Sequence, residues 1–182
     1  MTERPVFRPS SVDDFVPEVG RRDARPQPFP HLSGDGEARM VDVSAKEVTA
    51  RSASARGTVL LSAECIAALR DDTLPKGDAL AVARIAGVMG AKRTSDLIPL
   101  CHPLPLTGVD VHLEVGDNGV DITATVRTTH RTGVEMEALT SVSVAALAVI
   151  DMIKGLDRGA RITDVRLERK EGGRSGTWVR DA

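Results

Sequence analysis

The chain has 182 residues, a formal net charge of -2 and 27% charged residues. This length suits one domain with a full hydrophobic core, and the lack of a basic excess argues against a protein that binds nucleic acid through charge. Cys65 and Cys101 form no CxxC motif, and no apolar run reaches the length of a membrane span. We therefore expect reduced cysteines in a soluble, cytoplasmic protein.

Residues 1–37 carry six prolines and mixed charges without an apolar period. This composition predicts a poorly ordered N-terminal extension. The folded domain is then expected to occupy residues 38–182.

The first half of this domain predicts a strand followed by two helices. Residues 48–61 are rich in small and β-branched residues, typical of a strand. Ser62 can cap a helix that runs to about Arg70, and Asp78 can cap a second helix. One face of the second helix carries Leu80 and otherwise small residues, which predicts close packing against another backbone: Ala83, Gly87, Gly90 and Ala91.

The second half predicts a hairpin, a long helix and a last strand. The string DLIPLCHPLP (96–105) holds three prolines and predicts a stiff connector. Apolar and polar residues then alternate over 109–115 and 120–126, around a Gly-Asp-Asn-Gly turn. A helix over 133–154, a strand over 162–167 and a glycine-rich tail follow. The order predicts an α+β, ferredoxin-like split βαβ fold, with a four-stranded antiparallel sheet and helices packed on one face.

The long apolar helix carries four ionisable residues: Glu135, Glu137, Asp151 and Lys154. Asp151 and Lys154 are three positions apart and share one face, so burial would shift both pKa values and make an acid/base pair. The alternative from the pattern alone is an ordinary solvated ion pair. Glu137 and Asp151 are separated by about 21 Å of helix. This separation indicates either a long ligand or sites shared between subunits.

Other polar residues can be interpreted either as ligand-binding or as ordinary surface groups. Lys76 lies where a helix begins and can bind an anion there, or be a solvated loop lysine. The GGRSG tail can hold phosphate through its amides, with Lys170 and Arg174 beside it, or form a plain turn. We expect no metal at Cys101 and His102, because the sequence offers no second Cys/His pair.

Four blocks, MVDVSAK (40–46), KGDALAVARIAGVMGAKRTSDLIPLCHPL (76–104), TGVEMEALTSVSVAALAVIDMIK (132–154) and GGRSG (172–176), together resemble the MoaC family of cyclic pyranopterin monophosphate synthases. The resemblance covers about residues 37–180. It implies a lyase of molybdenum cofactor biosynthesis that converts 3′,8-cyclo-7,8-dihydro-GTP to cyclic pyranopterin monophosphate and releases pyrophosphate. It also implies a homohexamer, a trimer of dimers with sites at subunit interfaces. No cofactor is implied, although Mg²⁺ is possible with the triphosphate.

The same resemblance implies roles for individual residues. The catalytic group is Asp151 with Lys154 and Lys76. The substrate-binding residues are Leu100, Cys101, His102, Glu135, Met136, Glu137, Lys170 and Arg174, the last in place of a lysine common in the family. We hypothesise that Glu135 and Glu137 bind the guanidine edge of the base, whose N–H groups match carboxylate acceptors. The alternative is a non-catalytic oligomeric protein that binds nucleotides or pterins, which would not need the acid/base pair.

Overall fold

The structure, a computed structural model, describes residues 37–181. The predicted poorly ordered extension falls almost entirely outside this range. The described elements are, in chain order, β1 (Thr49–Leu60), α1 (Ala63–Arg70), α2 (Ala79–Lys92), α3 (Thr94–Leu97), β2 (Leu106–Val115), β3 (Gly119–His130), α4 (Glu135–Ile153), β4 (Arg161–Glu171) and β5 (Trp178–Val179). The predicted order is confirmed, with the short helix α3 and the strand β5 added.

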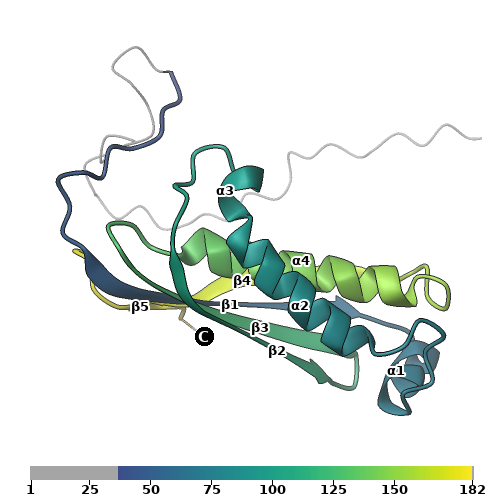
Figure 1. The fold of residues 1–182 in the computed structure, drawn as a ribbon. Helices are drawn as coiled ribbons and strands as arrows, with labels where there is room; N and C mark the ends of the chain where they lie inside the picture. The colour runs from purple at the N-terminus through teal and green to yellow at the C-terminus, as the bar shows by residue number, and fades with distance from the viewer. Residues whose placement is uncertain (1–36, 182) are drawn as a thin grey trace, which may run out of the picture. The chain divides into compact units, whose positions relative to one another are not determined.

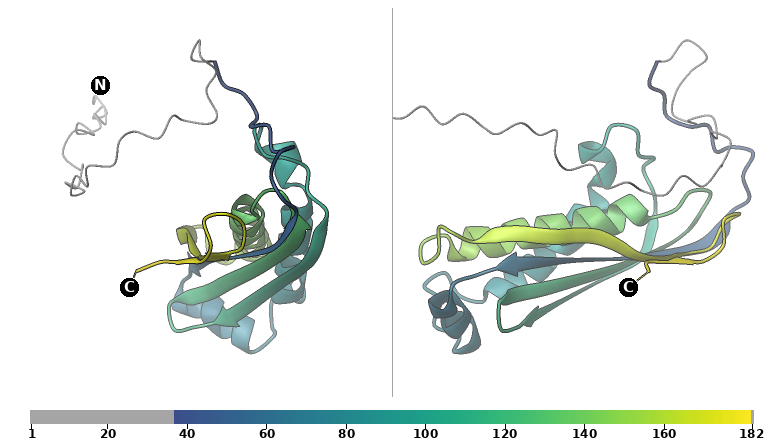
Figure 2. Two further views of the ribbon diagram at one scale, coloured as in Figure 1. Left: turned by 90° about the vertical axis from the view of Figure 1, so that its left-hand side faces the viewer. Right: turned by 180° about the vertical axis from the view of Figure 1, so that it is seen from behind.

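The strands form one antiparallel sheet in the order β2-β3-β1-β4-β5. Helix α4 packs on β1, β3 and β4, and α2 packs on β2 and along α4, so both long helices cover the same face (Figures 1 and 2). Strand β3 lies between β1 and β2, and β1 lies between β3 and β4. This arrangement of two split βαβ units confirms the ferredoxin-like plan.

The sheet has five strands, whereas the sequence predicted four. Strand β5 pairs with β4, with Trp178 opposite Lys170 and Val179 opposite Arg169. The chain turns back through Gly172 and Gly173, whose φ values of 89° and 70° suit glycine. A strand of two residues shows too little alternation to be recognised in a sequence, so the prediction ended in a tail.

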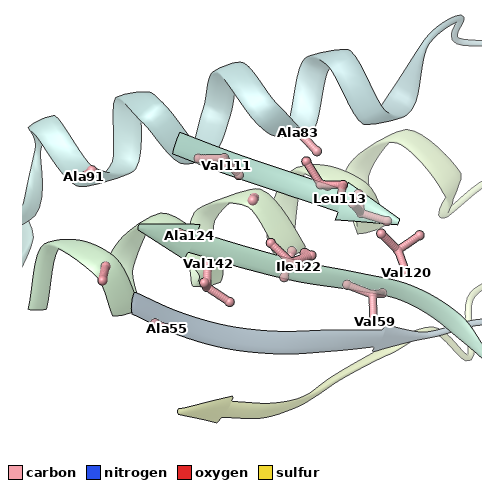
Figure 3. Packing of buried hydrophobic residues seen from close by; sticks show 14 of the residues in the cluster. Ala55, Val59, Ala83, Ala91, Val111, Leu113, Val120, Ile122, Ala124 and Val142 are labelled. Atoms are coloured by element: carbon pink, nitrogen blue, oxygen red, sulfur yellow. The ribbon is translucent and has the colours of Figure 1, made fainter. Parts of the chain in front are cut away.

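The core is aliphatic, as its composition predicts. Ala55 and Val59 of β1, Ile122 of β3 and Val142 of α4 are fully buried and belong to one hydrophobic cluster between the sheet and the helices (Figure 3). The strand residues come from alternate positions of neighbouring strands, because side chains of a strand point alternately to its two faces. The face turned towards the helices is therefore the one that forms the core.

Helices α2 and α4 approach closely at the predicted face of small residues. A Cβ atom added to Gly90 would lie 2.8 Å from the Cβ of Val144 and 3.2 Å from the carbonyl oxygen of Thr140. A Cβ at Gly87 would lie 3.1 Å from the carbonyl oxygen of Ser141. The backbones can pack at this distance because glycine occupies both positions.

Helix α4 is long and apolar enough to cross a membrane, with a mean hydropathy of 1.7 over its most apolar stretch, contrary to the prediction that no apolar run reaches that length. Half of this stretch is buried inside the fold. A core helix meets the same criteria of length and composition. The packing of α4 on the sheet and on α2 accounts for its apolar character.

Candidate active site

Lys76, Asp151 and Lys154 meet at the C-terminal end of α4 and are called the Asp151 cluster below. Lys154 Nζ lies 2.7 Å from Asp151 Oδ1, and Lys76 Nζ lies 3.3 Å from Oδ2. Lys76 Nζ also donates to the carbonyl oxygen of Asp151 at 2.6 Å. Lys76 is held nearby because Asp78 caps α2 two residues later. The structure thus brings together the three residues to which the family resemblance assigns a catalytic role.

The surroundings of this cluster differ from the prediction. The side chains of Asp151 and Lys154 are 59% and 60% exposed in the single chain, so neither lies in a low-dielectric interior. The pKa of Asp151 is lowered by hydrogen bonds from Lys154 and Lys76 and by their charges, which outweigh the small opposing effect of burial. Asp151 is therefore a carboxylate held between two ammonium groups. The expectation that the pair is buried is wrong for the chain taken alone.

A cavity of about 410 Å³ lies between the start of β1 and the turn from β4 to β5. Lys46, Arg51 and Arg174 give it three positive charges, and we call it the cationic cavity; its other lining residues are Ala45, Glu47, Thr49 and Gly173. Its volume falls in the range of about 300–1,000 Å³ found for small-molecule sites. Sequence reasoning identified Arg174 but missed Lys46 and Arg51. The signal available for Lys46 was its place in the MVDVSAK block.

Arg51 is fixed by the turn between β3 and α4. Its Nε donates to the carbonyl oxygen of His130 at 2.9 Å, and its Nη2 donates to that of Arg131 at 3.0 Å. Its Nη1 lies against Gly173, where an added Cβ atom would collide with the guanidinium. Two nitrogens are thus anchored to the backbone, and the charge is held against the glycine turn beside the cavity.

The glutamates at the start of α4 have different environments. Glu137 is only 4% exposed, and burial raises its pKa to about 7, with a further contribution from the charge of Glu135. Burial first, and then the charge of Glu137, raises the pKa of the Cys101 thiol. Cys101 therefore lies within electrostatic range of Glu137. Neighbouring Met136 is 37% exposed.

Lys170 connects the first turn of α4 to the glycine turn. Its Nζ lies 3.8 Å from Glu135 Oε1 and donates to Ser175 Oγ at 2.6 Å. The ammonium therefore contacts two protein groups and connects Glu135 to the turn that contains Arg174. The prediction that Lys170 binds substrate directly is untested by these contacts.

His102 lies with Leu100 and Cys101 on the connector between α3 and β2, and all three are half-buried. Its Nε2 lies 2.8 Å from the carbonyl oxygen of Val41. Because a carbonyl only accepts, Nε2 carries the proton, and in the neutral ring Nδ1 remains an acceptor. His102 therefore holds the MVDVSAK segment and can still offer Nδ1 to a ligand.

The predicted site residues form two groups. The Asp151 cluster lies at the C-terminal end of α4, while Glu135, Glu137 and their partners lie at its N-terminal end (Figure 1). The rise of a helix puts about 21 Å between Glu137 and Asp151. One chain alone does not bring these groups around a small substrate.

The pKa of Glu137 predicts a stability effect. Because the folded pKa of about 7 exceeds the ordinary 4.5, the unfolded chain loses this proton first, and stability falls as pH rises from 4.5 through 7. The loss corresponds to about 3 kcal/mol at 1.36 kcal/mol per pKa unit. We expect Glu137→Gln to raise the free energy of unfolding by about that amount at pH 8 and to change it little at pH 4.5.

Urea denaturation at both pH values, at one protein concentration, measures this difference. Glu114→Gln, on an exposed position of β2, is the matched control and should behave alike at both pH values. An equal effect of Glu137→Gln at pH 4.5 and 8 would show that the buried carboxyl does not titrate as described.

A model of the MoaC family matches residues 40–173 of the chain. The match includes every residue of the Asp151 cluster, Lys46 and Arg51. The chain belongs to the MoaC family. Three relatives of high identity carry the name cyclic pyranopterin monophosphate synthase. The cyclic pyranopterin monophosphate synthase of Streptomyces coelicolor is 65% identical over 150 residues, which are 82% of this chain and 88% of the relative.

The matches to the other two relatives span nearly the whole length of those relatives. The cyclic pyranopterin monophosphate synthase of a Nocardioides species is 59% identical over 158 residues, 85% of this chain and 97% of the relative. Cyclic pyranopterin monophosphate synthase 2 of Mycobacterium tuberculosis is 58% identical over 161 residues, 88% of this chain and 96% of the relative. The family model covers the fold from before β1 to the glycine turn after β4.

Proposed function

We propose that this MoaC family protein is a lyase that converts 3′,8-cyclo-7,8-dihydro-GTP to cyclic pyranopterin monophosphate and releases pyrophosphate, a step of molybdenum cofactor biosynthesis. The observation that carries the proposal is the Asp151 carboxylate held between the ammonium groups of Lys76 and Lys154. The names of its relatives support the reaction assigned to it.

The Asp151 cluster supplies groups for proton transfer. Opening a purine-derived ring and closing a pterin requires protons to be added to and removed from nitrogen and oxygen atoms. A carboxylate can accept such a proton, and the adjacent ammonium groups can donate one. In our proposal Asp151, Lys76 and Lys154 divide these steps.

The cationic cavity supplies charge for the phosphate chemistry. A ribose hydroxyl oxygen forms a bond to the α-phosphorus, the bond from that phosphorus to the bridging oxygen breaks, and pyrophosphate leaves with the electron pair. The hydroxyl proton passes to a base of the site. Positive groups stabilise the charge that develops on the leaving oxygens. In our proposal Lys46, Arg51 and Arg174 perform this role.

Glu135 and Glu137 are proposed to bind the guanidine edge of the base, next to Leu100, Cys101, His102 and Met136. The pKa of Glu137 near 7 allows its carboxyl either to accept or to donate a hydrogen bond near neutral pH. A substrate-bound structure with these carboxyls facing the triphosphate would refute this assignment.

The assembly is proposed to be a homohexamer, a trimer of dimers, in the cytoplasm. The two groups of site residues lie at opposite ends of α4, so a neighbouring chain is needed to complete one site. Helix α2 also presents apolar side chains at helical spacing, with Val82, Ile85 and Met89 exposed by 45%, 66% and 46%. Light scattering should give six chains per particle, and a monomer that is fully active would contradict the shared site.

The proposal includes no redox cofactor and no protein-bound metal, and any Mg²⁺ would accompany the triphosphate. Within residues 37–181, no group of three or more His, Cys, Asp and Glu side chains is suitably placed for a metal. Nucleic acid and membranes are not among the proposed partners.

The function is tested with purified protein and substrate prepared enzymatically from GTP. Mass spectrometry should detect cyclic pyranopterin monophosphate, and a phosphate assay after treatment with pyrophosphatase should detect two phosphates, from one pyrophosphate, per product. The alternative, a non-catalytic binding protein, predicts that substrate binds and is recovered unchanged. Recovery of intact substrate from the assembled protein would overturn the proposed function.

A further inference from the structure

A short segment, residues 41–46, crosses from the connector of His102 to the cationic cavity, and we call it the strap. The carbonyl oxygen of Val41 accepts from His102 Nε2 at 2.8 Å. At the other end, the carbonyl oxygen of Lys46 accepts from Arg131 Nε at 2.9 Å. The strap is thus held at both ends by side chains from distant parts of the sequence.

Packing does little to fix the end of the strap that carries Lys46. Residues 44–48 are all exposed, so few apolar contacts restrain them. The strap has one internal backbone hydrogen bond here, from Lys46 N to the carbonyl oxygen of Val43 at 3.0 Å. Ser44 N also donates to Asp42 Oδ1 at 2.8 Å, and Thr49 pairs with His130 where β1 begins. Between these two points, the hydrogen bond from Arg131 is the side-chain contact that holds the Lys46 backbone beside the cavity.

Arg131 also contacts the second cation of the cavity. Its own carbonyl oxygen accepts from Arg51 Nη2 at 3.0 Å. One residue, which does not itself line the cavity, is thereby bonded to the backbone of Lys46 and to the guanidinium of Arg51. The side chain of Arg131 bonds to Lys46, and its backbone carbonyl bonds to Arg51. A substitution of Arg131 can therefore remove the first hydrogen bond and keep the second.

We propose that Arg131 is a positioning residue that holds the Lys46 ammonium at the cationic cavity and so favours binding of the pyrophosphate group. This inference rests on the proposed function of the cavity. A lysine whose backbone is already fixed loses less conformational freedom when a phosphate binds. Arg131 acts through Lys46 and does not touch the ligand.

The test measures pyrophosphate binding to the complete protein by titration calorimetry. Arg131→Gln removes the guanidinium but keeps the carbonyl that anchors Arg51. We expect the Kd for pyrophosphate to rise about five-fold, as for the loss of one hydrogen bond. Arg127→Gln is the matched control: Arg127 lies on β3, is exposed and pairs with Asp110, so its loss should leave Kd unchanged.

The decisive comparison is made in the Lys46→Ala background. If Arg131 acts through Lys46, Arg131→Gln then has almost no further effect on Kd. An equal five-fold loss in both backgrounds would mean that Arg131 acts by long-range charge or by general stability, and would overturn the proposal. If Arg131→Gln does not fold by circular dichroism, Arg131→Met, which keeps the apolar stem, replaces it in the same comparison.

Failure of this inference can be told from failure of the proposed function. A wild-type protein that forms product and binds pyrophosphate, beside an Arg131→Gln protein with unchanged Kd, refutes the positioning role alone. A wild-type protein that neither forms product nor binds pyrophosphate refutes both.

Discussion

Replacing Asp151 with asparagine is expected to lower kcat by about 10²–10⁴-fold, the range typical for the loss of general acid–base catalysis. The amide keeps the size of the side chain but cannot accept a proton from a reacting group. It also removes the negative charge that now pairs Lys76 with Lys154. Formation of cyclic pyranopterin monophosphate, followed by mass spectrometry under saturating substrate, measures the effect.

Asp110→Asn is the control for this experiment. Asp110 is likewise an exposed carboxylate paired with a basic residue, Arg127, but it lies on β2, away from the Asp151 cluster. Its replacement should leave kcat unchanged, and both variants should keep the oligomeric mass of the wild type. If Asp151→Asn retains at least half of the wild-type kcat, the cluster is not the catalytic centre.

Replacing Arg51 with alanine is expected to lower kcat/KM by about 10–100-fold. The substitution removes a charge from the cationic cavity and leaves the carbonyl oxygens of His130 and Arg131 without their donor. Hydrogen bonds to charged groups contribute roughly 1.5–3 kcal/mol, which corresponds to a loss of this size. Initial rates over a range of substrate concentrations separate the change in KM from the change in kcat.

Arg56→Ala provides a matched control on the same strand. Arg56 is exposed, lies 3.9 Å from Asp121 and does not line the cavity, so its loss should leave kcat/KM within about two-fold of the wild type. Arg51→Lys adds a second comparison, because an ammonium keeps the charge but lacks the planar guanidinium that bonds both carbonyls. Equal rates for Arg51→Ala and Arg56→Ala would remove Arg51 from the site.

Much of the fold follows from local patterns. Strict alternation predicts the hairpin of β2 and β3, and the caps Ser62 and Asp78 are confirmed as the starts of α1 and α2. Arg51 was missed although its position carried a signal. It shares the inward-facing alternation of Ala53 and Ala55, and a charged residue in such a series points towards the buried side.

The surroundings of Asp151 could not be read from its neighbours in sequence. The apolar residues before it predict burial, yet exposure at the last turn of a helix depends on where the sheet beneath it ends. The pairing of Lys76 with Asp151 likewise depends on the tertiary structure and cannot be read from local sequence, because the two residues are 75 positions apart. By contrast, the separation of the two groups of site residues follows from helical rise alone.

The glycines where α2 meets α4 have a meaning for chemistry as well as for packing. Lys76 lies just before α2, and Asp151 lies in the last turn of α4. The distance between the two helices therefore affects the distance between the Lys76 ammonium and the Asp151 carboxylate. A larger side chain at Gly87 or Gly90, neither of which contacts Lys76 or Asp151, would push the two helices apart and change the distance between those two residues. In the proposed mechanism, the missing methyl groups at these two positions therefore help to set the distance over which a proton moves between Lys76 and Asp151.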